Sequence, residues 1–320
     1  MVLAGLSAFL VSVIAVLFLM PHYIKFLKKI SFNQTVSEYS LEEYQQKAKT
    51  PTMGGVLFVL VPVIVTFIFK PDAIFDLDIA IILLAFVGYG AIGFLDDYII
   101  VIKQDNQGLL ARDKFLLQVV LAVIFFFIYQ SHTSLDIRIP IVNFILPLGG
   151  LYGILIFFMF VGGSNAVNLT DGMDGLAAGC SFIAFIPFLL FAIQDRNVSI
   201  VVFICSLMGA LVGYLRYNIH PAKIFMGDAG SLALGGALAA VAMVLKQEVA
   251  LLFIGGVFVW ETLCVIIQIT SVKITGKKVF KYTPIHYSFV LSGMKETQVV
   301  KSFWILATIC AVVGFIIAVL

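Results

Sequence analysis

Long runs of apolar residues, separated by short polar segments rich in glycine and proline, extend along the whole chain. A helix that crosses a bilayer needs about 20 mostly apolar residues, and about ten runs approach that length. We therefore predict an all-α fold, a polytopic membrane protein of about ten transmembrane helices forming a single domain over residues 1–320. The expected spans are residues 2–24, 53–70, 79–99, 115–130, 140–162, 176–193, 198–215, 231–246, 249–270 and 302–320.

The composition agrees with this fold class. Hydrophobic residues make up 62% of the chain and charged residues 12%, whereas soluble domains are about half apolar and about a quarter charged. The first run, Leu3 to Met20, has neither a basic leader nor a small-x-small cleavage site, so we expect a retained span rather than a signal peptide. The net charge of +2 says little by itself, and no nucleic-acid partner is expected.

Basic residues gather in alternate loops between the expected spans. By the positive-inside rule the basic loops are cytoplasmic, which places both termini outside. The loops 25–52 and 271–301 on that side are also long, so we expect the active site on the cytoplasmic face. The basic loops hold Lys25, Lys28, Lys29, Lys47, Lys49, Lys103, Arg112, Lys114, Arg216, Lys223, Lys273, Lys277, Lys278, Lys281, Lys295 and Lys301. The other loops hold Lys70, Arg138, Arg196 and Lys246.

Five aspartates lie at the cytoplasmic ends of the expected spans. Asp96 and Asp97 end the third span, Asp171 and Asp174 follow the fifth, and Asp228 precedes the eighth. Acids at a membrane edge without a basic partner favour a bound cation. Each cluster alone could also be a solvated loop or a marker of the water interface. If the segment after the fifth span is helical, Asp171 and Asp174 share a face.

These acids predict a magnesium site. Mg²⁺ usually takes one or two carboxylates and completes its octahedron with water and phosphate oxygens. We expect Asp228 to be the metal ligand and the helix start beside it, with free N–H groups, to cradle a phosphate. Lysines and threonines of the segment 47–55 and His286 are suitable partners for a pyrophosphate, although the lysines alone fit the positive-inside pattern. Glu261, inside the ninth span, is interpreted as a structural brace and kept out of the catalytic set.

Four segments together resemble one enzyme superfamily. They are Thr50 to Gly55, Asp96 to Tyr98, Asn165 to Ala177 and Ala222 to Asp228. In this order they resemble the polyprenyl-phosphate N-acetylhexosamine-1-phosphate transferase superfamily, and within it the phospho-N-acetylmuramoyl-pentapeptide transferases. The resemblance implies a Mg²⁺-dependent homodimer in the bacterial cytoplasmic membrane. It would move phospho-MurNAc-pentapeptide from UDP-MurNAc-pentapeptide to undecaprenyl phosphate, giving lipid I and UMP.

The resemblance also implies roles for individual residues. Asp228 resembles the Mg²⁺ ligand, Asp96, Asp97 and His286 resemble catalytic-site residues, and Lys114 resembles the phosphate-contacting lysine. The implied substrate-binding residues are Lys47, Thr52, Asn168, Asp171, Asp174, Asn218 and Phe225, with Phe225 as a stacking surface for uracil.

The chain also departs from the family pattern. Where the family usually has three histidines it has His286, Tyr287 and Ser288, so only the first role is carried over. Lys49 stands where a glycine is common, and Ile100 where some members have a lysine.

The implied reaction has alternatives. A phosphate monoester with a second pKa of about 6 is largely dianionic at pH 7, so the lipid phosphate can attack the β-phosphorus in one step without a general base. A two-step route would instead use an aspartate nucleophile. A GlcNAc-1-phosphate transferase that primes teichoic acid or surface polysaccharide is an alternative function. A cation-coupled transporter is a more distant one, because transport sites tend to lie near the bilayer midplane.

Overall fold

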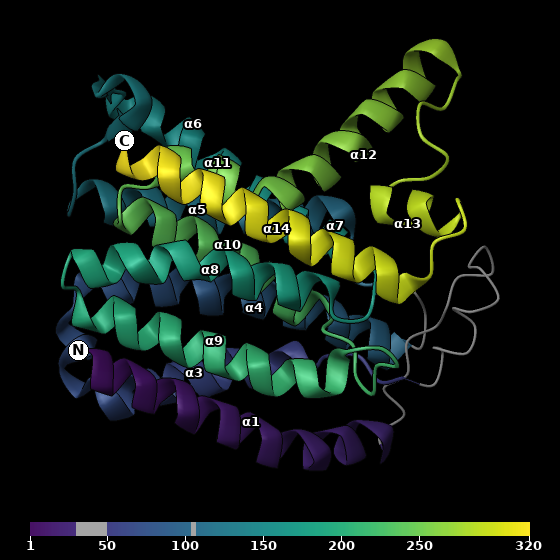
Figure 1. Cartoon of the computed structure of the whole chain (residues 1–320), viewed down its shortest axis with the longest axis horizontal. Coiled ribbons are helices and arrows are strands. Elements are labelled where there is room, and N and C mark those ends of the chain that lie inside the picture. Colours follow the sequence, from purple (N-terminus) through teal and green to yellow (C-terminus); the bar gives the residue numbers. More distant parts are fainter. Residues whose placement is uncertain (30–49, 104–106) are drawn as a thin grey trace.

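The computed structural model describes residues 1–29, 50–103 and 107–320, and most of this part of the chain is helical (Figure 1). Helices are the expected form for apolar runs in lipid, because each backbone N–H and C=O must be paired within its own segment. The helices are α1 (Val2–Lys29), α3 (Gly55–Phe69), α4 (Leu77–Lys103), α5 (Ala111–Gln130), α6 (Tyr152–Phe157), α7 (Gly163–Thr170), α8 (Leu176–Gln194), α9 (Val198–Asn218), α10 (Asp228–Val244), α11 (Glu248–Ile254), α12 (Gly256–Thr275), α13 (Ile285–Val290) and α14 (Glu296–Val319). Two strands, β1 (Asp136–Ile139) and β2 (Phe144–Pro147), three 3₁₀ turns (Pro71–Phe75, Pro140–Val142, Gly149–Leu151) and a π-helical turn (Phe158–Gly162) complete the described elements.

Seven helical segments are long and apolar enough to cross a membrane. Helices α3 and α10 are apolar but shorter, with 15 and 17 residues. Every expected span overlaps helical structure, which confirms a polytopic helical membrane protein; ten crossings remain a prediction. The seven segments are Val2–Lys29, Leu77–Val101, Gly149–Thr170, Leu176–Gln194, Val198–Asn218, Gly256–Thr275 and Glu296–Val319.

The expected span 140–162 is wrong at its beginning. This region opens with a hairpin in which β1 pairs antiparallel with β2, with Ile137 opposite Leu146. Asn143 makes the turn with a φ of 46°, a left-handed conformation that asparagine tolerates better than most residues. The helix begins only after the hairpin, at Tyr152, and continues through the π-helical turn into α7.

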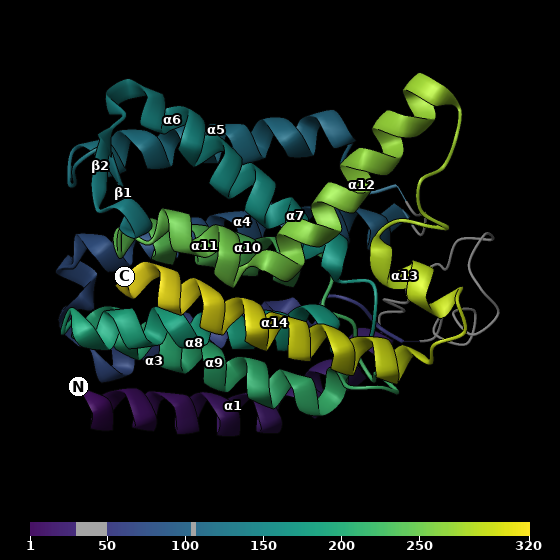
Figure 2. The same cartoon turned by 45° about the horizontal axis from the view of Figure 1, so that its top comes forward.

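The expected span 249–270 is interrupted. Gly255 separates α11 from α12, so the run forms two helices instead of one. The far end of α12 stands away from the other helices in both views (Figures 1 and 2). The connection from α12 then returns to the bundle through α13, which brings that short helix back beside α14 (Figure 2).

Helix α10 lies at the centre of the packing. Its residues from Ala229 to Met243 are buried, and many are glycine or alanine, which lets neighbouring helices approach closely in a membrane. Helix α4 packs along it. At Gly93 of α4, an added Cβ would overlap the carbonyl oxygen of Asp228, so only glycine allows this approach. The acids one turn further along α4 are thereby brought to the first residues of α10.

Both chain termini lie at the same end of the bundle (Figures 1 and 2). The start of α10, the last turns of α4 and α13 lie at the opposite end. Two termini at one end of the bundle are compatible with the predicted placement of both on one side of the membrane. Their position outside the cell stays a prediction.

Candidate active site

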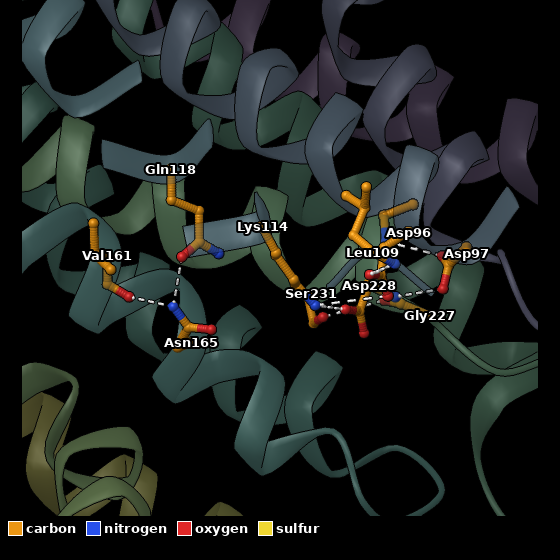
Figure 3. A network of polar contacts seen from close by, with 11 residues as sticks. Asp96, Asp97, Leu109, Lys114, Gln118, Val161, Asn165, Gly227, Asp228 and Ser231 are labelled. Carbon is orange, nitrogen blue, oxygen red and sulfur yellow. Dashed lines mark hydrogen bonds and ion pairs between the residues drawn. The ribbon is translucent and has the colours of Figure 1, made fainter. Parts of the chain in front are cut away.

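Asp97 holds the first turn of α10 (Figure 3). Its carboxylate accepts hydrogen bonds from the backbone N–H groups of Asp228 (3.1 Å) and Ala229 (3.0 Å). The first N–H groups of a helix have no partner within the helix, and a carboxylate there also interacts favourably with the helix dipole. The prediction that these N–H groups cradle a phosphate is therefore wrong, because Asp97 already occupies them.

Lys114 lies between two of the acids (Figure 3). Its ammonium group forms an ion pair with Asp228 and lies 3.7 Å from the carboxylate of Asp96. Asp96 also accepts a hydrogen bond from the backbone N–H of Leu109 (2.9 Å), which ties the segment before α5 to α4. All three charged side chains are largely buried but retain some contact with solvent. The structure thus places a cation and two carboxylates where an anionic substrate can reach them.

The segment containing Thr52 pairs with the segment before α10. The N–H of Gly54 donates to the carbonyl oxygen of Phe225 (2.8 Å), and the N–H of Phe225 donates to that of Pro51 (2.8 Å). This pairing places the Thr52 hydroxyl beside Gly227, next to the Asp97 carboxylate. Two predicted substrate contacts from distant parts of the chain therefore share one edge of the site.

Asp171 lies just past the end of α7 and not within a helix. Its N–H donates to the carbonyl oxygen of Asn168 (3.0 Å), and a turn follows, so Asp171 and Asp174 do not share a helix face. Burial raises the pKa of Asp171 well above its ordinary value, and repulsion from Asp228, Asp97 and Asp174 raises it further. The amide nitrogen of Asn168 is buried, with no hydrogen-bond partner among the described residues. Both side chains therefore suit a ligand, a cationic one in the case of Asp171.

Asp174 contacts two residues, His220 and Glu296, that were not predicted to belong to the site. Its carboxylate accepts hydrogen bonds from the His220 ring (3.0 Å) and the N–H of Ala222 (3.0 Å), and its own N–H donates to Glu296 (2.9 Å). One ligand atom from each of Asp174, His220 and Glu296 lies within 4.8 Å of the others. No local pattern marks this cluster, because its members lie in three separate segments of the sequence.

Asn218 makes backbone contacts with both ends of its amide. Its oxygen accepts from the N–H of Gly175 (3.0 Å), and its nitrogen donates to the carbonyl oxygen of Ile224 (3.0 Å). Asn218 thus joins the turn before α8 to the segment before α10.

His286 is fully buried in α13. Its ring contacts Glu261 of α12, and the next residue, Tyr287, donates from its hydroxyl to the carbonyl oxygen of Gly172 (3.0 Å). Ser288 instead exchanges hydrogen bonds with the backbone of Tyr282, within the same segment. The residues that replace two family histidines therefore serve to dock α13. Lys47, the remaining predicted substrate residue, lies outside the described residues.

Comparisons with known proteins show which family this chain resembles in sequence. A family model described as glycosyl transferase family 4 matches residues 79–246, and a signature described as phospho-N-acetylmuramoyl-pentapeptide-transferase signature 1 matches residues 47–59. Curated proteins with that transferase name are similar over almost their whole length. The chain is 46% identical to the one from Geobacillus thermodenitrificans, over 99% of this chain and 98% of the relative. It is 48% identical to that from Staphylococcus saprophyticus (97% and 99%) and 45% identical to that from Bacillus subtilis (98% and 96%).

The chain belongs to the phospho-N-acetylmuramoyl-pentapeptide-transferase family. The family signature includes Thr52, and the glycosyl transferase model extends from α4 to the end of α10, so it includes Asp96, Lys114 and Asp228. Glu261, His286 and Glu296 lie beyond that model. They fall in the part of the chain that only the similarity to whole relatives covers.

The side chains at the start of α10 fit a divalent cation in this family. Asp96 and Asp228 offer carboxylate oxygens, the ligand type that Mg²⁺ prefers, and both face Lys114. An ammonium group between two acids shows that this position favours positive charge. Asp97 is less suited to a metal, because its two oxygens already accept backbone N–H groups.

Proposed function

We propose that this membrane enzyme transfers phospho-MurNAc-pentapeptide from UDP-MurNAc-pentapeptide to undecaprenyl phosphate, with Mg²⁺, to give lipid I and UMP. This is the first membrane step of peptidoglycan synthesis. One observation carries the proposal: Lys114 lies between Asp96 and Asp228 at the start of α10, in a chain similar over its whole length to transferases of this name.

The reaction is a displacement at phosphorus. An oxygen of the lipid phosphate forms a bond to the β-phosphorus of the UDP-sugar, the bond from that phosphorus to the bridging oxygen breaks, and UMP leaves with that oxygen. Mg²⁺ on Asp228 would neutralise charge on the pyrophosphate. Lys114 is placed to stabilise phosphate oxygens, and Asp96 keeps its ammonium group in position. Asp97 acts indirectly: it fixes the start of α10, the helix that carries Asp228.

The contacts of Asp97 weigh against a covalent route through that residue. A covalent route needs an aspartate oxygen free to attack phosphorus. Both oxygens of Asp97 accept backbone N–H groups, and Asp96 and Asp228 face Lys114. Labelled UMP incubated with enzyme and UDP-sugar, without lipid phosphate, checks this: Mg²⁺-dependent exchange of label into the UDP-sugar would contradict the one-step route.

The nucleotide side of the site is proposed to be formed by Thr52, Asn168, Asp171 and Phe225, together with Lys47, Asp174 and Asn218. Thr52 and Phe225 share the paired backbone segments beside Asp97. The partly exposed ring of Phe225 supports its proposed role as a stacking surface for uracil.

We place this single-domain enzyme as a homodimer in the bacterial cytoplasmic membrane, with the site on the cytoplasmic face and both termini outside. The position of the termini at the end opposite the site supports this topology. Protease accessibility of tags at each terminus in intact spheroplasts tests the orientation. Cross-linking in the bilayer tests the dimer.

The decisive experiment replaces Asp228 by alanine in the purified full-length protein. UMP release is measured in vesicles that contain undecaprenyl phosphate, with and without Mg²⁺. We expect transfer to fall by at least about 100-fold, because the loss of one preorganised charge contact at a transition state costs that much or more. The matched control is Asp72→Ala, since Asp72 is an exposed acid paired with Lys70 in the turn between α3 and α4.

Retained transfer in Asp228→Ala would contradict the metal assignment. UDP-GlcNAc offered in competition with UDP-MurNAc-pentapeptide tests the alternative donor. Transfer of GlcNAc-1-phosphate in preference would replace the proposed substrate by a precursor of teichoic acid or surface polysaccharide. An absence of any lipid-dependent UMP release by the parent protein would instead support a transporter.

A further inference from the structure

Glu261 is a fully buried acid in α12, and all of its contacts with α13 are made through hydrogen bonds that it accepts. One carboxylate oxygen accepts from the backbone N–H of Ile285 (2.7 Å). The other lies 2.9 Å from the ring Nδ1 of His286 and 3.3 Å from its backbone nitrogen. A buried carboxylate is costly unless it is well paired, so three donors from one short helix are a specific arrangement.

This arrangement determines which ring nitrogen of His286 is available. A carboxylate only accepts hydrogen bonds, so Nδ1 must carry the hydrogen, and Nε2 is the nitrogen left for another partner. Nε2 is buried and has no hydrogen-bond partner among the described residues. It faces Gly172, where an added Cβ would overlap it. The free nitrogen is therefore directed at the turn that follows Asp171.

The helix that carries His286 depends on such anchors. α13 has six residues, and a helix of that length is unstable without tertiary contacts. Glu261 holds its first turn, while Tyr287 holds it to Gly172 from the other side. The position of Nε2 relative to the turn is thus set from both sides.

A second contact on α12 shows that the segment after this helix can be held to it without a charged side chain. Gln268, two turns further on the same helix face, accepts from the N–H groups of Val279 (2.9 Å) and Phe280 (3.0 Å) and donates to the Phe280 carbonyl oxygen (3.0 Å). This neutral amide fastens the same connection to α12 without a charge. Of these two contacts between α12 and the segment that follows it, the one made by a carboxylate is the one that faces an imidazole ring.

We propose that Glu261 is a positioning residue for transfer. It holds His286 as the Nδ1–H tautomer and directs Nε2 to substrate at the turn after Asp171. Carboxylates orient histidines in this way in other enzymes. The inference rests on the proposed function, because it assigns His286 to the substrate side of that site. Glu261 acts only through the ring and does not touch substrate.

The test is a double-mutant cycle on full-length protein in lipid vesicles. Glu261→Gln retains the shape and one acceptor oxygen but turns an amide nitrogen toward the ring or the helix start. His286→Asn retains a donor for Glu261 and removes Nε2. We expect Glu261→Gln to lower kcat/KM for the UDP donor by about 10- to 100-fold, as the loss of an orienting partner of a functional histidine does. In the His286→Asn background the same change should cost less than about 2-fold, because its partner ring is gone.

Equal losses in both backgrounds would overturn the proposal, since a merely structural Glu261 would act independently of the ring. Gln268→Leu is the matched control: it should lower the melting temperature and cost the same factor of activity in both backgrounds. If Glu261→Gln does not fold, Glu261→Asp replaces it in the cycle, because it keeps the charge and shortens the reach by one methylene. Selective ¹⁵N labelling of histidine gives a second readout. The His286 signal should be that of the Nδ1–H tautomer in the parent and should change in the Glu261 variant.

The parent protein is assayed first. No lipid-dependent UMP release by the parent would count against the proposed function. Release by the parent together with an additive cycle would count against the role of Glu261 alone.

Discussion

Replacing Asp97 by asparagine separates helix capping from chemistry. Asp97 accepts two backbone N–H groups at the start of α10, and hydrogen bonds to a charged partner contribute about 1.5–3 kcal/mol each. Asparagine keeps one acceptor oxygen and turns an amide N–H toward the second donor. We expect the free energy of unfolding to fall by about 2–3 kcal/mol. Alanine removes both bonds and should cost about 3–6 kcal/mol.

The assay follows thermal unfolding of the purified variants in detergent together with Mg²⁺-dependent transfer in vesicles. Both should fall in Asp97→Asn, because a loosened helix start also displaces Asp228. The control is Asp96→Asn, which interrupts one backbone contact, that with Leu109, and should destabilise less. If Asp97→Asn melts with the parent yet loses transfer, the carboxylate takes part in the chemistry and our capping account is wrong.

Three further changes test other parts of the structure. Burial raises the pKa of Asp171 in the folded protein, so the folded state binds a proton more tightly there, and stability is lost as pH rises above about 4. Asp171→Asn should therefore melt at a higher temperature than the parent, and the difference in melting temperature should grow with pH. A difference that does not change with pH would contradict this. Gly172→Ala introduces a Cβ that overlaps the His286 ring, so transfer should fall by about 100-fold while helix content by circular dichroism stays unchanged. Tyr152→Phe removes the hydroxyl that donates to buried Glu248 on the side of the termini, so unfolding should cost about 1–3 kcal/mol less while kcat of the folded enzyme stays within about 2-fold.

Much of the fold follows from the sequence because lipid leaves few choices. A long apolar run can satisfy its backbone in a membrane only as a helix, so every expected span overlaps helical structure. The hairpin of β1 and β2 escaped detection because its residues are also apolar. Its signals were the alternation around Arg138 and the prolines at its turns, which cannot donate to a helix ladder.

The sequence predicted many members of the site but not the contacts that each of them makes. Asp96 and Asp97 look alike as a pair, yet one contacts Lys114 and the other caps α10, a difference set by the packing of α4 against α10. His220 has no acid beside it in the sequence but contacts Asp174 in the structure. Glu261 was expected to brace the bundle, and its partner, the His286 ring, could not be named without the return of α13.

The predicted placement of both termini on one side of the membrane also constrains the number of crossings. A chain whose ends lie on one side crosses an even number of times. Seven crossings would place them on opposite sides, so the predicted topology requires crossings beyond the seven long apolar segments of the described residues. The shorter apolar helices α3 and α10 must be considered as well.

The short length of these two helices affects where a lipid substrate and a soluble nucleotide come into contact. Helices α3 and α10, with 15 and 17 residues, extend about 22 and 26 Å, less than the roughly 30 Å of a hydrocarbon core. Helix α1, at 28 residues, extends about 42 Å, so the apolar helices of this bundle differ widely in length. A bilayer responds to such mismatch by local thinning. We expect water to enter the protein as deep as the phosphate headgroup of the lipid substrate. The polyprenyl chain then remains in the leaflet, and the soluble nucleotide reaches the headgroup from the water.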